Sequence, residues 1–261
     1  MNSLMIAIQV EGLKIIKSKV LWIVTAFFVF IPMMIGLLML LVKYPEIASK
    51  MGIISSTKAE MVGDADWPTM FKMMGQIISA GGFFGFGFVA SWVFGREYSE
   101  RTLKDLLALP ISRTTIVLAK FVVISIGSLA LSILMFATSI AVGKLVGLGE
   151  LTSNIITIEF FRFEMAALLL IALCTPVAFF ANAGRGYMLP LGSLIMLVIF
   201  AQFIGVVGLA PYFPWAIPAL FFEEAGGTDT GLSIASYVIW FLTSALGLYF
   251  TQYWWNKVDQ T

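Results

Sequence analysis

Six long apolar runs divide the chain, and each has about the length that a helix needs to cross a lipid bilayer. Such a helix requires roughly 20 predominantly apolar residues. The runs lie at about 20–42, 70–94, 116–142, 163–183, 187–209 and 232–254. Aromatic residues near several run ends, such as Trp22 and Trp92, are typical of the membrane–water interface. The pattern therefore predicts an all-α integral membrane protein with six transmembrane helices in a single domain.

The segment 2–19 precedes the first run and has the pattern of an amphipathic helix. Apolar side chains share one arc of a helical wheel, whereas Glu11, Lys14 and Lys17 gather on the opposite side. This arrangement favours an N-terminal helix that lies in the membrane interface. A simple continuation of the first transmembrane helix is the alternative, since Gly12 weakens a separate helix.

The segment 96–120 is a short charged interruption between the second and third runs. It carries five of the sixteen Lys and Arg residues of the chain. A segment this polar between two membrane spans lies in water, and its basic excess is typical of the cytoplasmic side. Its apolar positions have the i, i+3, i+4, i+7 spacing of one helix face, which predicts a short helix at about 99–109. These positions are Leu103, Leu106, Leu107 and Pro110.

Capping residues mark the ends of this short helix. Thr102 and Asp105 have the spacing of a helix start, and Pro110 stops the helix. Ser112 is placed to cap the third transmembrane helix. A mere connector has no need of an apolar stripe, so we expect the helix to contact another protein. A solvated connector without further function is the alternative.

The charge distribution predicts how the chain is oriented in the membrane. Six spans place both termini on one side. With the termini inside, the inner segments carry ten basic and five acidic residues, and the outer segments carry six basic and ten acidic residues. Because basic residues are retained on the cytoplasmic face, both termini are expected in the cytoplasm.

Three apolar segments carry signals beyond simple hydrophobicity. Gly81 and Gly85 form a G-x-x-x-G, which lets another helix approach closely. No strand precedes them and no P-loop lysine follows, so a nucleotide site is excluded there. Pro176 predicts a kink in the fourth span. The segment 211–224 is too apolar for an ordinary loop and too rich in proline for a full span, which predicts a partly re-entrant outer segment.

The amino-acid composition argues against several kinds of functional site. The chain is 60% hydrophobic and 12% charged, whereas soluble domains carry about 25% charged residues. It contains no histidine and one cysteine, so an intramembrane enzyme would lack an obvious acid–base pair, and neither a disulfide nor a metal site is expected. A net charge of +1 offers no field that attracts nucleic acid.

Three features of the chain are similar to a known family. They are EYSERTLKDLLALPISR at 97–113 with IVLAK after it, six spans behind a short N-terminal helix, and YFPWAIPAL at 212–220. Together they cover nearly the whole chain. They resemble the permease subunits of ABC type-2 exporters, which include bacitracin-resistance and nitrous-oxide-reductase-maturation permeases. The charged segment is the most specific of the three features.

The resemblance implies a division of labour between chains. Two permease copies, most simply a homodimer, sit in a bacterial or archaeal cell membrane and pair with separate ATPase subunits that hold ATP and Mg²⁺. The chain lacks G-x-x-x-x-G-K-[ST], which agrees with a non-catalytic permease that carries no cofactor of its own. The resemblance also implies which residues couple to the ATPase: Glu97, Glu100, Arg101, Thr102, Leu103, Lys104, Asp105, Leu106, Leu107 and Pro110.

The cargo is the least determined property. Spans rich in Phe, Met and Gly suit an amphipathic or lipid-like cargo such as a peptide antibiotic, although the same residues also serve helix packing and lipid contact. We expect Thr175, Asn182 and Gln202 to line a cavity.

A stand-alone secondary transporter or channel is the alternative function. Such proteins bury ionisable residues as relays within their spans. Here Lys72, Arg162 and Glu164 are expected near the outer ends of spans, which weakens that alternative.

Overall fold

The computed structural model describes residues 3–46, 63–108 and 110–257, and this part of the chain forms helices and no β-strand. Residue 2 of the predicted interfacial helix and residue 109 of the predicted coupling helix lie outside the described residues. Six helices are long and apolar enough to cross a membrane, which confirms the predicted fold class. These are α2 (Lys19–Lys43), Trp67–Ser99, α8 (Arg113–Val146), Ser153–Ala183, α11 (Met188–Val206) and α13 (Ile234–Lys257).

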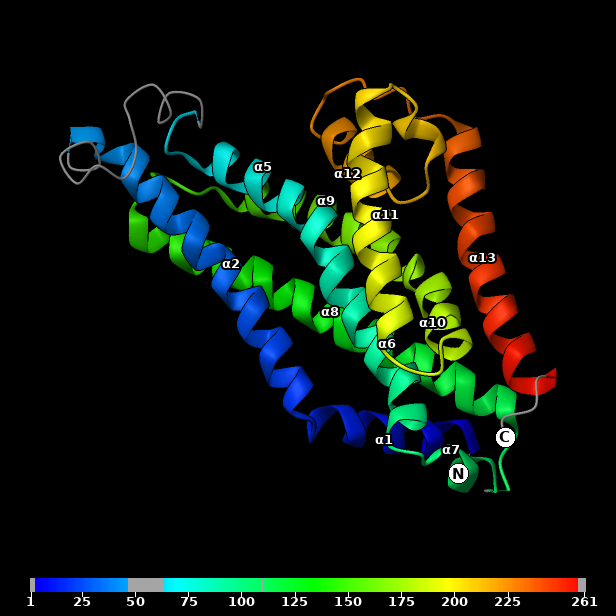
Figure 1. Cartoon of the computed structure of the whole chain (residues 1–261). Helices are drawn as coiled ribbons and strands as arrows, with labels where there is room; N and C mark the ends of the chain where they lie inside the picture. Colours follow the sequence, from blue (N-terminus) through cyan, green and yellow to red (C-terminus); the bar gives the residue numbers. More distant parts are fainter. Residues whose placement is uncertain (1–2, 47–62, 109, 258–261) are drawn as a thin grey trace.

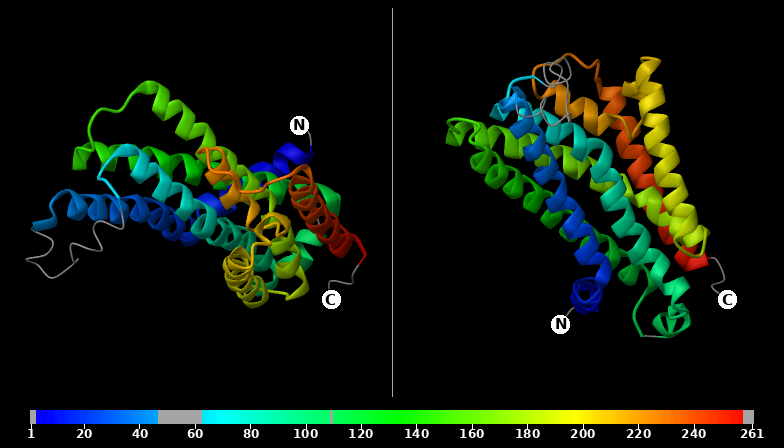
Figure 2. Two further views of the ribbon diagram at one scale, coloured as in Figure 1. Left: turned by 90° about the horizontal axis from the view of Figure 1, so that it is seen from above. Right: turned by 60° about the vertical axis from the view of Figure 1, so that its left-hand side comes forward.

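The N-terminal segment forms a helix of its own, α1 (Ser3–Ile16), rather than a continuation of α2. It lies across the end of the bundle at which α13 also finishes (Figure 1). The chain turns at Ser18, whose hydroxyl accepts a hydrogen bond from the Leu21 N–H at 3.2 Å and so caps α2. In the right-hand view of Figure 2, α1 is seen nearly end-on, and α2 rises from it toward the opposite end of the bundle.

The second span is a continuous helix with one widened turn. It consists of α5 (Trp67–Ile77), the π-helical turn η1 (Ile78–Gly82) and α6 (Phe83–Ser99). A π-turn inserts an extra residue and shifts the helix faces before and after it. Gly81 and Gly85 therefore have different surroundings. A Cβ on Gly85 would lie 2.5 Å from the Phe28 ring, whereas one on Gly81 would meet only Ile77 of its own helix, at 3.7 Å.

The expectation that these two glycines form one helix-packing motif is thus wrong for Gly81. Gly85 does allow α2 to approach, because the Phe28 ring occupies the space of a side chain there. Gly81 lies within the π-turn, and the shifted register turns it away from α2.

The fourth span is broken at the place that the sequence predicts. It consists of α9 (Ser153–Ala172) and α10 (Cys174–Ala183), which meet at Leu173, three residues before Pro176. The Thr175 hydroxyl lies 2.9 Å from the Ala172 carbonyl oxygen and 2.6 Å from that of Ser244 on α13. The Thr175 hydroxyl at the kink therefore connects the fourth span to the sixth.

The segment before the last span contains a single 3-10 turn, η2 (Ala210–Tyr212), and a short helix, α12 (Ile217–Glu224). α12 lies at the end of the bundle opposite α1 (Figure 1). It is well packed, since Ile217 is 0% exposed and Phe222 is 1% exposed. Entry of this segment into the membrane stays a prediction.

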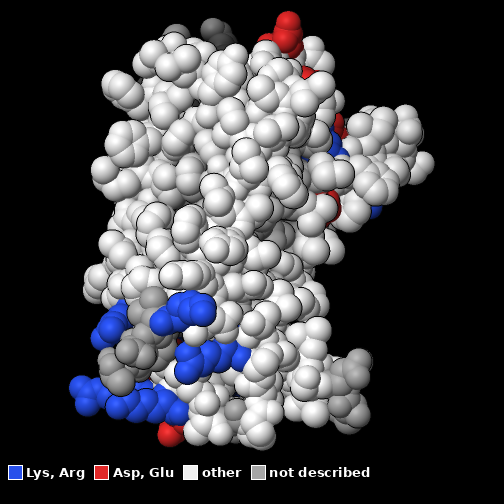
Figure 3. All heavy atoms as spheres, turned by 90° about the vertical axis from the view of Figure 1, so that its right-hand side faces the viewer, with Lys and Arg blue, Asp and Glu red and all other residues white. Residues whose placement is uncertain are grey.

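Charged side chains are distributed unevenly along the bundle. On the face shown in Figure 3, Lys and Arg side chains gather at the end that carries α1 and the short helix α7 (Leu103–Leu107), and uncharged residues cover the middle. A broad uncharged band with basic side chains at one end is the distribution expected of helices that cross a bilayer.

Candidate functional site

The predicted coupling helix is shorter than the sequence suggests. The structure contains α7 over Leu103–Leu107 only, after a turn in which Arg101 adopts a left-handed φ of 59°. The helix begins directly after Thr102, as the T-x-x-D pattern predicts, but the expected capping bond is absent, because the Thr102 hydroxyl donates to Glu97 Oε2 at 2.7 Å instead. Ser112 caps α8 as predicted and accepts a hydrogen bond from the Thr115 N–H at 3.1 Å.

The apolar stripe of α7 faces the bundle. Leu103 is 6% exposed, and Leu106 and Leu107 are half-buried against the core. The expectation that the stripe docks on another protein is therefore wrong for Leu103. A helix this short is not stable alone, and its contacts with the bundle hold it in place. The charged residues around α7 are exposed instead, namely Glu100, Arg101, Lys104 and Asp105, and so is Pro110 after the helix.

Behind α7 lies a buried ion cluster, made of Glu11, Lys14, Glu97 and Lys120. Lys120 is 0% exposed, and its Nζ atom lies 2.9 Å from Glu11 Oε2 and 3.0 Å from Glu97 Oε1. The same nitrogen donates to the Val93 carbonyl oxygen at 3.0 Å. Two cations balance two anions, so no charge of the cluster is buried without a partner. The cluster joins α1, α6 and α8.

Lys14 completes the cluster at its outer edge. Its Nζ atom lies 2.6 Å from Glu11 Oε1 and 3.1 Å from Glu97 Oε1. Burial alone lowers the pKa of Lys14, but the hydrogen bonds and negative charges of Glu11 and Glu97 outweigh this and raise the pKa above its ordinary value. Lys14 therefore stays protonated.

The charged side of α1 faces the protein. A purely interfacial helix turns such a side toward water, yet Glu11 is 5% exposed and lies between Ala7 and Ile15 on the buried edge. Leu13 and Ile16 are 54% and 62% exposed. Lys17 is exposed and lies outside the cluster. The helical-wheel pattern predicts that polar and apolar side chains lie on different sides of α1. It does not identify the residue that the polar side contacts, which is Lys120.

Lys120 is the site residue that the sequence reasoning missed. The charge distribution includes Lys120 only among the basic residues of the inner segments. Its position inside the predicted apolar run 116–142 is the signal that indicates a buried partner, since a lysine within a span needs one.

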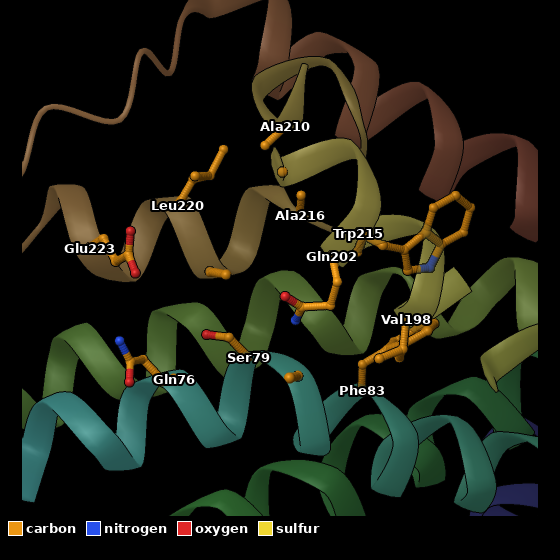
Figure 4. Close-up of a pocket in the computed structure, with 14 residues that line it drawn as sticks. Gln76, Ser79, Phe83, Val198, Gln202, Ala210, Trp215, Ala216, Leu220 and Glu223 are labelled. Carbon is orange, nitrogen blue, oxygen red and sulfur yellow. The ribbon is translucent and has the colours of Figure 1, made fainter. Parts of the chain in front are cut away.

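A second site lies near the opposite end of the bundle. A cavity of about 380 Å³ is bounded by α5, η1, α6, α11 and α12. Polar groups enter it from several elements, namely Gln76, Ser79, Gln202 and Glu223 (Figure 4). Trp215 also lines it, and its buried indole N–H has no hydrogen-bond partner among the described residues. The cavity thus combines an apolar wall with a few polar groups, as small-molecule sites do.

Of the three predicted cavity residues, only Gln202 lies in this wall. Asn182 Oδ1 accepts a hydrogen bond from the Trp255 indole at 2.8 Å, and its amide nitrogen donates to the Ala178 carbonyl oxygen at 2.7 Å. The prediction is wrong for Asn182 and Thr175 with respect to this cavity. Both side chains use their polar atoms to join α10 to α13.

Glu164 lies inside the helix bundle, well after the first residue of its helix. α9 begins at Ser153, well before the predicted start at 163, so Glu164 falls within a continuous helix. It is 8% exposed, and its Oε2 atom accepts a hydrogen bond from the Ser132 hydroxyl at 2.6 Å. Its other carboxylate oxygen has no hydrogen-bond partner within the described part of the chain. The position of Glu164 near the outer end of the span stays a prediction.

Comparison with known proteins identifies the family of the chain. A family model described as ABC-2 family transporter protein matches residues 7–205, which include most of α1, all of α7 and the whole buried ion cluster. The chain is 29% identical over 187 residues to the bacitracin transport permease protein BCRB of Bacillus licheniformis, an alignment that covers 67% of this chain and 83% of that protein. No solved structure matches the chain significantly. The chain therefore belongs to the ABC-2 family of transporter proteins and is a permease subunit of an ABC transporter.

Proposed function

We propose that the chain is the membrane-spanning subunit of an exporter driven by a separate ATPase chain. The observation that carries this proposal is the buried ion cluster directly behind the charged outer side of α7. Family membership supports an ATPase partner in general. In this proposal the ATPase contacts α7 and α1, and this chain hydrolyses no ATP.

The ion cluster connects α1, α6 and α8 to one another, and one hydrogen bond ties the residue before α7 to it. Thr102 is bonded to Glu97 of α6, and Glu97 is paired with Lys120 of α8. Pulling such buried charges apart costs several kcal/mol per ion, so the connected helices move together. A displacement of α7 on ATP binding therefore reaches α6 and α8 and biases the bundle between inward- and outward-facing states.

The proposed working unit is a homodimer in a bacterial or archaeal cell membrane, with both termini in the cytoplasm. ATP and Mg²⁺ are held by the two ATPase subunits. α11 and α13 support dimerisation or lipid contact, because most of their residues are exposed although they are apolar. Phe203 and Phe241, for example, are 69% and 62% exposed.

We propose that the cavity near α12 receives part of an amphipathic or lipid-like cargo. Its volume of about 380 Å³ is at the lower end of the range for small-molecule sites, roughly 300–1,000 Å³. It therefore suits one ring or side chain of a peptide antibiotic rather than a whole one. Bacitracin is the first cargo to test, since it is named for the similar permease.

Co-purification tests the ATPase contact. The tagged permease is purified from its source cell, and the ABC ATPase that accompanies it is identified by mass spectrometry. The double variant Lys104→Glu/Asp105→Lys keeps the net charge but exchanges two exposed charges of α7. We expect it to lose most of the ATPase while its membrane insertion is unchanged. Lys257→Glu, which alters an exposed charge outside α7, is the control.

Normal recovery of the ATPase with the exchanged charges would contradict contact through α7. Loss of the ATPase with the control variant as well would show a general charge effect and would equally count against a specific contact.

The buried Glu164 favours a second candidate function, a secondary transporter or channel that works alone. An ionisable group inside a bundle is typical of proton and ion pathways. Purified permease in liposomes, without any ATPase, separates the two functions. Cargo movement driven by a pH gradient and abolished by Glu164→Gln would support the second function and contradict the first.

A further inference from the structure

A pocket of about 630 Å³ lies where α1 turns into α2, and α6 forms its other wall. It is separate from the cargo cavity and lies beside the buried ion cluster rather than inside it. Lys17 and Lys19 lie on its rim, and Arg96 lies on the α6 side. Its position at the first residue of the first span places it at the boundary between the membrane and water.

The pocket has an excess of positive charge. Lys14 already pairs with Glu11 and Glu97. Arg96 Nε lies 3.2 Å from Glu100 Oε2, close enough for an ion pair but without an aligned hydrogen bond. Within residues 3–46, 63–108 and 110–257, neither Lys17 nor Lys19 forms a salt bridge.

The pocket therefore presents two exposed lysine charges that are not engaged in a salt bridge with a described carboxylate. A ligand with one or two negative charges would balance them without disturbing the existing pairs.

The rest of the pocket is apolar. Val10 and Leu13 of α1 and Val20 of α2 face it, and all three are at least partly exposed. Trp92 lies beside them, and the guanidinium carbon of Arg96 is 5.1 Å from the centroid of its ring. Tryptophan with an apolar body and a polar tip is the residue that marks lipid headgroup level. The pocket thus offers cations on one side and an apolar wall on the other.

We propose that this pocket binds an acidic glycerophospholipid from the leaflet on the side of α1. The headgroup phosphate lies between Lys17 and Lys19, and an acyl chain runs along Leu13, Val20 and Trp92. Basic pockets between membrane helices are known to select anionic headgroups by charge. The lipid would fix the angle between α1 and α2, and the fixed angle holds Glu11 against Lys120 and Lys14 against Glu97.

Native mass spectrometry of the full chain in a nonionic detergent tests this proposal. The protein is equilibrated with dioleoylphosphatidylglycerol, dioleoylphosphatidylcholine or inorganic phosphate, and the bound fraction is measured against ligand concentration. We expect phosphatidylglycerol to bind at least about 10-fold more tightly than phosphatidylcholine, because each surface lysine favours an anionic headgroup. This preference should decrease in high salt.

The variant Lys17→Gln/Lys19→Gln should remove that preference and leave phosphatidylcholine binding unchanged. The matched control is Lys104→Gln/Lys257→Gln, which removes two exposed lysines elsewhere on the protein and outside the pocket. It should bind both lipids as the unmodified chain does. Neither lysine of the test variant belongs to the buried ion cluster, so the fold is expected to persist.

Three results would overturn the proposal. The first is equal phosphatidylglycerol affinity in the chain and in Lys17→Gln/Lys19→Gln. The second is displacement of the lipid by millimolar inorganic phosphate, which would show a site for free phosphate rather than for a lipid. The third is unchanged lipid binding together with a loss of ATPase co-purification in the same variant, which would assign the pocket to the ATPase. Each readout is independent of whether the chain exports any cargo.

Discussion

Arg162 of α9 holds Phe222 of α12 in two ways. Its guanidinium carbon lies 3.8 Å from the centroid of the Phe222 ring, and its Nε atom donates to the Phe222 carbonyl oxygen at 2.6 Å. α12 also contributes Leu220 and Glu223 to the proposed cargo cavity. One arginine therefore fixes the helix that lines that cavity at the end of the bundle opposite α1.

Arg162→Met should loosen α12 without unfolding the bundle. The change removes the stacked cation and a charge-assisted hydrogen bond, together worth about 2 kcal/mol or more. Hydrogen exchange measured by mass spectrometry should therefore show amides 217–224 exchanging at least about 10-fold faster. Glu159→Gln is the control, since it alters only the 3.3 Å pair on the far side of Arg162. Unchanged exchange in Arg162→Met would show that α12 is held by packing alone.

The buried ion cluster should give strongly non-additive stability effects. Lys120→Met leaves two buried carboxylates that share one cation, and loss of one partner of a buried pair costs about 3–5 kcal/mol. Glu11→Gln alone also destabilises. The double variant Lys120→Met/Glu11→Gln should be more stable than the sum of the single effects predicts, by at least about 1 kcal/mol. Denaturation midpoints in detergent measure this, and additive effects would contradict a shared cluster.

Replacing Gly81 or Gly85 by alanine should change the stability of the protein in different directions. Gly85→Ala places a methyl group 2.5 Å from the Phe28 ring, and such overpacking costs about 1–3 kcal/mol. Gly81→Ala meets only an ordinary contact with Ile77 and should be neutral or stabilising by up to about 1 kcal/mol. Thermal unfolding of the two variants, followed by tryptophan fluorescence, gives the comparison. Equal losses would mean that both glycines pack against a neighbouring helix.

Gln202→Leu should weaken cargo handling while leaving ATPase assembly intact. The change keeps the size of the side chain and removes both polar atoms from the cavity wall, so bound cargo loses about one hydrogen bond, worth roughly 0.5–1.5 kcal/mol. The bacitracin concentration that inhibits cells expressing the permease and its ATPase should fall severalfold. Asn182→Leu is unsuitable as a control, because Asn182 supports Trp255.

Met196→Leu on the exposed side of α11 is the matched control, since it lies outside the cavity. It should leave the inhibitory concentration unchanged. Full resistance in Gln202→Leu would exclude Gln202 from cargo binding.

The long apolar runs predict the six spans of this chain well, because each span is apolar over almost its whole length. Local signals such as Ser112 and Pro176 also predict a cap and a kink correctly, since their partners lie within a few residues. The sequence does not show which neighbouring element each face of a helix contacts. The stripe at Leu103 and the charged side of α1 both turn toward the chain itself, and only long-range packing decides this.

The same limit applies to the cavity. Thr175, Asn182 and Gln202 are equally plausible as polar residues of apolar spans. Two of them find partners on α13, which follows far along the sequence, and only Gln202 faces the cavity. The π-turn that carries Ser79 into the cavity wall has no recognisable sequence signal.

The buried ion cluster also sets an order in which the chain can be assembled. Lys120 lies 109 residues after Glu11 and 23 residues after Glu97. During synthesis α1 emerges first, and Glu11 has only Lys14 as a partner until α6 and then α8 follow. A lysine buried within a span needs a partner, and the two carboxylates that are already in place supply it. The third span therefore enters most easily once the first helix and the second span are already in place.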